Sequence, residues 1–191
     1  MSEPNQQSEA VKLVLVFYGA MAAAGTLLAY WRSPAWENID PWALPGAEWP
    51  LHLGVTLALV ATVHWATRLA MARFRSVRQS GRDLRRMLGD LSPATILLFA
   101  IASGVGEELL FRGWLLGETG LVISSLLFGA IHIPPNRKWL YWPAFAAAMG
   151  FLLGWLYLWS GSLVYPILLH AGINYFNMRH MYAVDAPPGA R

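Results

Sequence analysis

Long apolar runs constrain the fold of this 191-residue chain more than any other feature. A membrane-spanning helix needs about 20 mainly apolar residues, because hydrocarbon offers the backbone no water to bond with. Six runs are candidates: 11–31, 51–71, 93–116, 121–133, 141–159 and 163–178. The fourth is short for a full crossing, so we expect it to be tilted, extended back through 117–120, or re-entrant. The sequence predicts an all-α fold, a polytopic membrane bundle of about six transmembrane helices.

Composition agrees with a bilayer as the solvent. Hydrophobic residues make up 56% of the chain and charged residues 13%, whereas soluble domains have roughly 45–50% and about 25%. The chain has no cysteine, which excludes disulfides, cysteine-bound zinc and a thiol nucleophile. The net charge of +3 matters less than the position of the arginines, so we expect the lipid bilayer as a partner and no nucleic acid.

The loop after the second run carries the strongest charge pattern. Basic residues collect in short cytoplasmic loops, and arginines bracket this one: Arg68, Arg73, Arg75, Arg78, Arg82, Arg85 and Arg86. We therefore expect this loop and both termini in the cytoplasm, with Arg137, Lys138 and Arg179 on the same side. The favoured interpretation of the arginines is a topology signal, and binding to anionic lipid headgroups is the alternative.

Tryptophans near the ends of the runs are predicted to anchor at the headgroup level. They are Trp31, Trp36, Trp42, Trp49, Trp139, Trp142 and Trp159.

Three charged residues lie inside the third run, where each costs roughly 2.5–3.5 kcal/mol on insertion scales. On a helix, Glu108 and Arg112 are four residues apart and share a face, so they can neutralise each other, as a catalytic support or as a structural ion pair. Glu107 points about 100° away and is left free for acid–base chemistry. The nearby Gly104 and Gly106 can let another helix or a substrate approach, or weaken the helix.

Two later runs each bring a histidine. His132 ends the fourth run, and His170 and Asn174 lie four residues apart on one face of the sixth. Taken singly, such residues more often serve helix packing. Together with Glu107 they form a set that can activate water and stabilise an oxyanion in a polar intramembrane cavity.

Three motifs resemble those of a known family. Residues 106–113, Gly-Glu-Glu-Leu-Leu-Phe-Arg-Gly, resemble the E-E-x-x-x-R motif of the CPBP intramembrane proteases, which include CAAX-prenyl endopeptidases and bacteriocin-processing or self-immunity (Abi) proteins. Residues 128–132 resemble the family's F-x-x-x-H motif, and 170–174 its H-x-x-x-N motif. The resemblance divides the chain into two helices with an arginine-rich loop (1–90), a protease core (91–178) and a flexible tail (179–191).

The resemblance implies an intramembrane endopeptidase that cleaves a membrane-associated protein, in a bacterial inner membrane. Glu107 and His132 would activate water, His170 and Asn174 would stabilise the oxyanion, and Glu108 and Arg112 would support them. The family has been described both as metal-dependent and as glutamic. Because no H-E-x-x-H signature is present, we favour hydrolysis without a metal. A divalent ion such as zinc on Glu107, His132 and His170 stays open.

Two other functions stay open. The chain can be a non-catalytic immunity or scaffold protein, or a proton or ion pathway, since relays also use intramembrane Glu and His. One geometric difficulty also arises, because straight helices place Glu107 about 20 Å along the third run and His132 at the inner end of the fourth. We predict that a tilt, a break near Gly104 and Gly106, or a re-entrant segment brings them together.

Overall fold

The computed structural model describes residues 4–32, 46–132 and 141–184, and every regular element in these ranges is helical. The predicted all-α fold is confirmed. The elements are α1 (Pro4–Arg32), the 3₁₀ turn η2 (Gly46–Glu48), α2 (Trp49–Arg73), α3 (Arg75–Leu88), α4 (Pro93–Leu110), the π-helical η3 (Phe111–Leu115), α5 (Leu116–Ile131), α6 (Tyr141–Ser160) and α7 (Val164–Val184).

Within the described residues, four stretches are long and apolar enough to cross a membrane: Val11–Trp31, Gly46–Arg73, Pro93–Ile131 and Tyr141–Ser160. The helical membrane bundle is therefore confirmed. The count differs from about six because Pro93–Ile131 contains the third predicted run and residues 121–131 of the fourth, and α7 is not among the four. Arg137, Lys138, Trp36, Trp42 and Trp139 lie outside the described residues.

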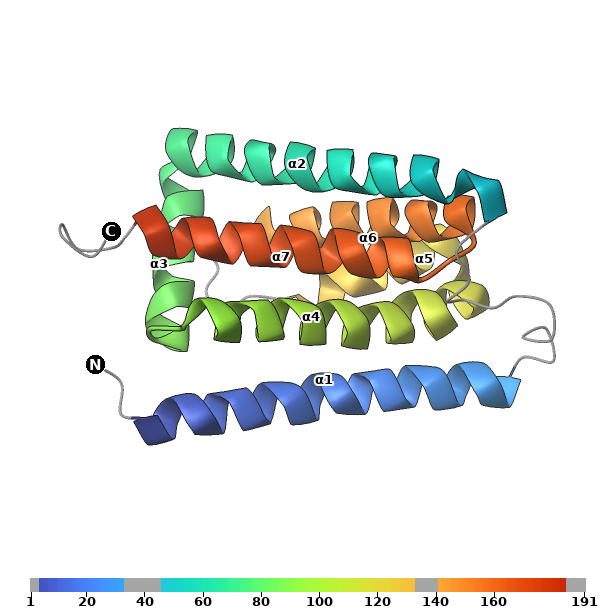
Figure 1. Cartoon of the computed structure of the whole chain (residues 1–191), viewed down its shortest axis with the longest axis horizontal. Helices are drawn as coiled ribbons and strands as arrows, with labels where there is room; N and C mark the ends of the chain where they lie inside the picture. Colours follow the sequence, from blue (N-terminus) through green and yellow to red (C-terminus); the bar gives the residue numbers. More distant parts are fainter. Residues whose placement is uncertain (1–3, 33–45, 133–140, 185–191) are drawn as a thin grey trace.

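The long helices run side by side, and α3 lies across one end of the bundle, between α2 and α4 (Figure 1). The sequence prediction treated this arginine-rich stretch as a loop. It is helical because arginine has a high helix propensity and because Gly89, with φ of 71°, supplies the turn that ends α3. Ser92 then begins α4 by accepting a hydrogen bond from the Thr95 backbone N–H, followed by Pro93 in the first turn.

Helix α4 lies between α1 and α7, and glycines permit both contacts. A Cβ at Gly106 would stand 2.6 Å from the Tyr18 carbonyl oxygen of α1, and one at Gly104 would stand 3.2 Å from Ala171 of α7. The expectation that these glycines let other helices approach is confirmed. The helix itself is unbroken at both positions, so the predicted break there is wrong.

The chain reverses direction at Gly120, whose φ of 77° and ψ of 171° interrupt the helix that follows η3. Glu107 precedes Gly120 by about as many residues as His132 follows it, close to 20 Å of helix on either side at 1.5 Å per residue. An antiparallel return therefore brings His132 back to the level of Glu107. The short α5 runs back from this reversal and so resolves the geometric difficulty, in the way that the predicted re-entrant segment would.

The C-terminal helix continues past the predicted end of the sixth run. Residues 179–184 belong to α7, whereas the sequence prediction placed them in a flexible tail. Tertiary contacts hold them: Tyr182 donates a hydrogen bond to the Gly89 carbonyl at 2.6 Å and packs against the apolar cluster of Leu91, Ile96 and Phe99. Residues 185–191 lie outside the described part of the chain.

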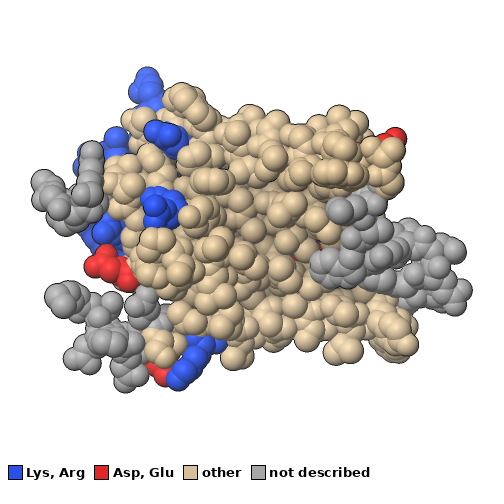
Figure 2. Space-filling view, in the orientation of Figure 1, with Lys and Arg blue, Asp and Glu red and all other residues tan. Residues whose placement is uncertain are grey.

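The visible face of the molecule shows no charged residues along most of its length, and lysines and arginines gather at the end where α3 lies (Figure 2). Large apolar side chains such as Leu57, Val122, Leu126 and Leu158 are exposed on the helix sides. Trp31, Trp49, Trp142 and Trp159 are also exposed. This distribution fits lipid around the middle of the bundle and headgroups at its ends.

Candidate active site

A buried network of charges joins four elements of the bundle. The Glu108 Oε1 atom accepts hydrogen bonds from Arg112 Nη1 at 2.7 Å and from His170 Nδ1 at 2.8 Å. Arg112 Nη2 also donates to the Gly150 carbonyl of α6 at 2.9 Å. Glu108 is fully buried and Arg112 is 3% exposed. The predicted Glu108–Arg112 ion pair is confirmed, and the network fixes His170 of α7 against α4.

Glu107 faces away from this ion pair, toward the two motif histidines. Its Oε2 atom lies 3.7 Å from His132 Nε2 and 3.9 Å from His170 Nε2. These separations are too long for direct hydrogen bonds, and Oε2 is buried without a hydrogen-bond partner. The structure therefore brings together Glu107, His132 and His170 from three helices.

The hydrogen bond that each histidine makes through Nδ1 determines whether its Nε2 atom, which faces Glu107, carries a proton or a lone pair. His132 Nδ1 lies 2.6 Å from the Phe128 carbonyl oxygen, which only accepts, so this nitrogen carries the proton. His170 Nδ1 donates to the Glu108 carboxylate in the same way. In the neutral rings both Nε2 atoms are then acceptors, like the Glu107 carboxylate. Three acceptors around one point need a shared proton or a donor such as water.

Asn174 lies one helical turn beyond His170 and does not contact Glu107 directly. Its Nδ2 atom donates to Ser103 Oγ at 3.0 Å, and Ser103 lies one turn before Glu107 on α4. The pairs Glu107 with His170 and Ser103 with Asn174 match the register of antiparallel helices. Ser103 is buried and also donates to the Ala100 carbonyl, so it fixes the Asn174 side chain.

Two further residues in the cluster escape the sequence analysis. The Tyr18 side chain of α1 lies near Glu107. Phe128 is buried, and the Arg112 guanidinium lies 4.6 Å from its ring centroid, with His132 at 4.6 Å and His170 at 6.1 Å. Phe128 is the first residue of the F-x-x-x-H motif, and this position in the motif could have indicated that it lies in the cluster. Tyr18 had no such signal, because nothing in the sequence of α1 indicates which side chain meets α4.

Zinc binds carboxylate oxygen and imidazole nitrogen, so the donor types of Glu107, His132 and His170 suit it. Within residues 4–32, 46–132 and 141–184, however, no group of three His, Asp or Glu side chains is arranged to hold a metal ion. The side chains as they stand do not form a metal site. Metal independence of the reaction stays a prediction, which a chelator tests.

Comparison with known families agrees with this geometry. A family model described as type II CAAX prenyl endopeptidase Rce1-like matches residues 90–176. Residues 90–176 therefore resemble this family. The Rce1-like segment contains all three motifs, and the family predicted from them is confirmed. Its match together with the apolar helices identifies the chain as an integral membrane protein.

One similar protein has no assigned activity. The uncharacterized protein YpbD of Bacillus subtilis (strain 168) is 32% identical over 118 residues, which cover 61% of this chain and 61% of YpbD. No solved structure matches this chain. The Rce1-like assignment therefore rests on the family model and the motif geometry.

Proposed function

We propose that this Rce1-like protein is an intramembrane endopeptidase that hydrolyses a peptide bond in a membrane-associated protein segment. The observation that carries the proposal is the buried, unpartnered Oε2 atom of Glu107, 3.7 and 3.9 Å from the Nε2 atoms of His132 and His170. A water molecule has two protons to donate and an oxygen lone pair left for attack. It fits the donor that these three acceptors lack.

Glu107 is the proposed general base. Water between Glu107 and His132 gives one proton to the carboxylate while its oxygen bonds to the scissile carbonyl carbon. The proton then passes to the leaving nitrogen as the carbon–nitrogen bond breaks, which yields a new carboxyl end and a new amino end. The Tyr18 side chain lies near Glu107, and its proposed role is to hold the carboxylate in the orientation that this transfer needs.

His170 and Asn174 are the proposed oxyanion stabilisers. His170 donates from Nε2 only when that nitrogen carries a proton, and the imidazolium so formed is stabilised by the Glu108 carboxylate bonded to Nδ1. Asn174 keeps a second N–H on Nδ2 after bonding Ser103. Glu108 and Arg112 act as positioning residues, because they hold His170 and do not face Glu107.

We propose the inner membrane of a bacterium as the location, with both termini and the arginine-rich end in the cytoplasm. The proposed substrate is a protein or peptide with a membrane-associated segment. The alternatives are a non-catalytic immunity or scaffold role and a proton or ion pathway.

The experiment compares peptide termini in membranes of the native host that carry the wild type, Glu107→Gln or Glu48→Gln at equal abundance. Glu48 is an exposed acid outside the site, so its variant is the matched control. We expect new termini with the wild type and Glu48→Gln and none with Glu107→Gln. Identical termini in all three would contradict the proposal. A proton flux in liposomes that depends on Glu107 would then favour the pathway alternative.

A further inference from the structure

The C-terminal helix α7 carries a stripe of polar side chains that continues beyond the Rce1-like motifs. His170, Asn174, Asn177 and His180 follow one another at spacings of four, three and three residues, so each is a neighbour of the one before it on the helix surface. The proposed mechanism uses only His170 and Asn174. Polar side chains inside a membrane bundle are costly and mark sites or pathways, so the second half of the stripe calls for a function of its own.

Asn177 joins α7 to α2 through a second polar pair. The Nδ1 atom of His64 lies 2.8 Å from Asn177 Oδ1, and Asn177 Nδ2 donates to Thr67 Oγ1 at 3.4 Å. His64 and Thr67 belong to the apolar span Gly46–Arg73, outside the segment that matches the Rce1-like model. Helix α2, which carries no family motif, therefore adds polar groups to the stripe on α7.

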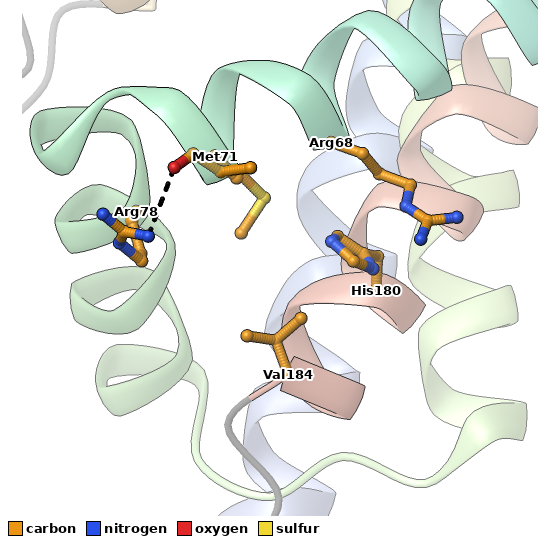
Figure 3. Close-up of a pocket in the computed structure, with 6 residues that line it drawn as sticks. Arg68, Met71, Arg78, His180 and Val184 are labelled. Carbon is orange, nitrogen blue, oxygen red and sulfur yellow. Dashed lines mark hydrogen bonds between the residues drawn. The ribbon is translucent and has the colours of Figure 1, made fainter.

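The stripe reaches the arginine-rich end at His180. Its ring centroid lies 6.0 Å from that of His64, and His180 and Arg68 line one pocket of about 240 Å³ between α2, α3 and α7 (Figure 3). The wall of this pocket is mostly apolar, so what it adds to the stripe is open space beside His180. Ten residues separate His170 from His180, about 15 Å of helix at 1.5 Å per residue. The stripe therefore runs from the buried cluster at Glu107 to the basic end of the bundle.

In the opposite direction from His170, apolar packing closes the same helix. Tyr165 and Leu169 are 1% and 0% exposed, and they pack with Leu153 and Leu156 of α6 in one core cluster. A water molecule finds few hydrogen-bond partners in such a layer, whereas along the stripe it meets a polar side chain at every turn. The polar approach to the cluster along α7 is therefore from the arginine-rich end.

Hydrolysis consumes one water molecule for each peptide bond, and Glu107, which is 6% exposed, lies inside the bundle. We propose that the polar stripe from His180 through Asn177 to Asn174 is the route by which water reaches Glu107 from the arginine-rich end. Hydrogen bonds to these side chains replace those that the water molecule gives up in bulk solvent. The role of the stripe as a water supply rests on the proposed peptidase function, whereas its accessibility to water does not, so the two are tested separately.

Accessibility is tested by single-cysteine labelling, which has no background because the chain contains no cysteine. The water-soluble thiol reagent 2-sulfonatoethyl methanethiosulfonate is added to open membrane fragments that carry Asn177→Cys or Phe176→Cys in the full chain. Phe176 is the matched control, because it is the adjacent residue at nearly the same depth and is 46% exposed, more than Asn177. Thiolates form in water and are suppressed in apolar surroundings, so we expect Asn177→Cys to react about tenfold faster or more.

Labelling after unfolding in sodium dodecyl sulfate checks that each cysteine is present and reactive. A reaction at position 177 that is no faster than at position 176 would overturn the route. The bonds of Asn177 to His64 and Thr67 would then serve only to join α7 to α2.

The supply of water is tested with His180→Cys, because this position is remote from the cluster along α7. The attached reagent narrows the route there and leaves Glu107 and His170 untouched, so it should lower kcat about threefold or more with KM unchanged. Reduction of the mixed disulfide with dithiothreitol should restore the rate, and the wild type, which has no thiol, should not respond to the reagent.

An unchanged cleavage rate in the labelled His180→Cys variant would overturn the supply role. Absence of cleavage in every variant, labelled or not, would contradict the proposed peptidase and the supply role together. The labelling of Asn177→Cys would still decide whether the stripe admits water.

Discussion

The Nε2 atom of His132 lies 3.7 Å from the Oε2 atom of Glu107, because the chain reverses direction at Gly120 between them. Nearly equal lengths of helix before and after the reversal bring the two side chains to one level of the bundle. The His132 side chain is 22% exposed, whereas the Glu107 side chain is only 7% exposed. A substrate carbonyl can therefore reach the cluster from the His132 side.

Arg112→Met should destabilise the protein by about 3–5 kcal/mol, because it leaves the buried Glu108 carboxylate without its cation. The double variant Glu108→Gln/Arg112→Met should recover much of this loss, since neither charge is then buried alone. Thermal unfolding in detergent measures both. Equal destabilisation by the single and the double variant would show that the ion pair does not carry the effect.

Tyr18→Phe should lower the rate of cleavage about tenfold or more while the folded protein stays intact, because it removes the hydroxyl that is proposed to orient the nearby Glu107 carboxylate. The control is Tyr30→Phe on the same helix, where the side chain is 83% exposed. Cleavage rates are compared at equal abundance, together with melting temperatures. An unchanged rate in Tyr18→Phe would remove Tyr18 from the site.

Gly106→Ala should destabilise the protein by about 1–3 kcal/mol through overpacking, because the new Cβ would lie 2.6 Å from the Tyr18 carbonyl oxygen. It should also lower activity, since α1 must shift away from Glu107. Gly54→Ala is the control, because a Cβ at Gly54 meets no atom within 4 Å. Melting curves that coincide for the two variants would contradict the close packing of α1 on α4.

A metal chelator should leave the cleavage rate within about twofold of the untreated enzyme, because Glu107 and the two histidines activate water without an ion in the proposed mechanism. The control adds back zinc after treatment. Loss of activity on chelation and recovery with zinc would contradict the prediction and would assign the three side chains to a metal.

Spacing within single helices predicted much of the candidate site. Glu108 and Arg112 pair because residues four apart share a helix face, and the three motifs place Glu107, His132 and His170 on apolar runs that pack together. Their catalytic roles stay predictions.

Contacts between helices could not be predicted from the sequence. The approach of Tyr18 to Glu107 depends on how α1 packs, and the hydrogen bond from Asn174 to Ser103 depends on the register between α4 and α7. A helix break near Gly104 and Gly106 was one of three predicted alternatives, because glycines weaken helices. Those two glycines instead permit tight packing, and the left-handed φ is at Gly120.

The measurement that tests the central claim most directly is the cleavage rate of one membrane substrate by the purified protein in liposomes, for the wild type and Glu107→Gln. The substrate is one of the proteins whose new termini appear in host membranes only with the active protein. The account predicts a rate about 10²–10⁴-fold lower in Glu107→Gln, with an unchanged melting temperature. Equal rates in the two proteins would contradict the assignment of Glu107 as the base that activates water.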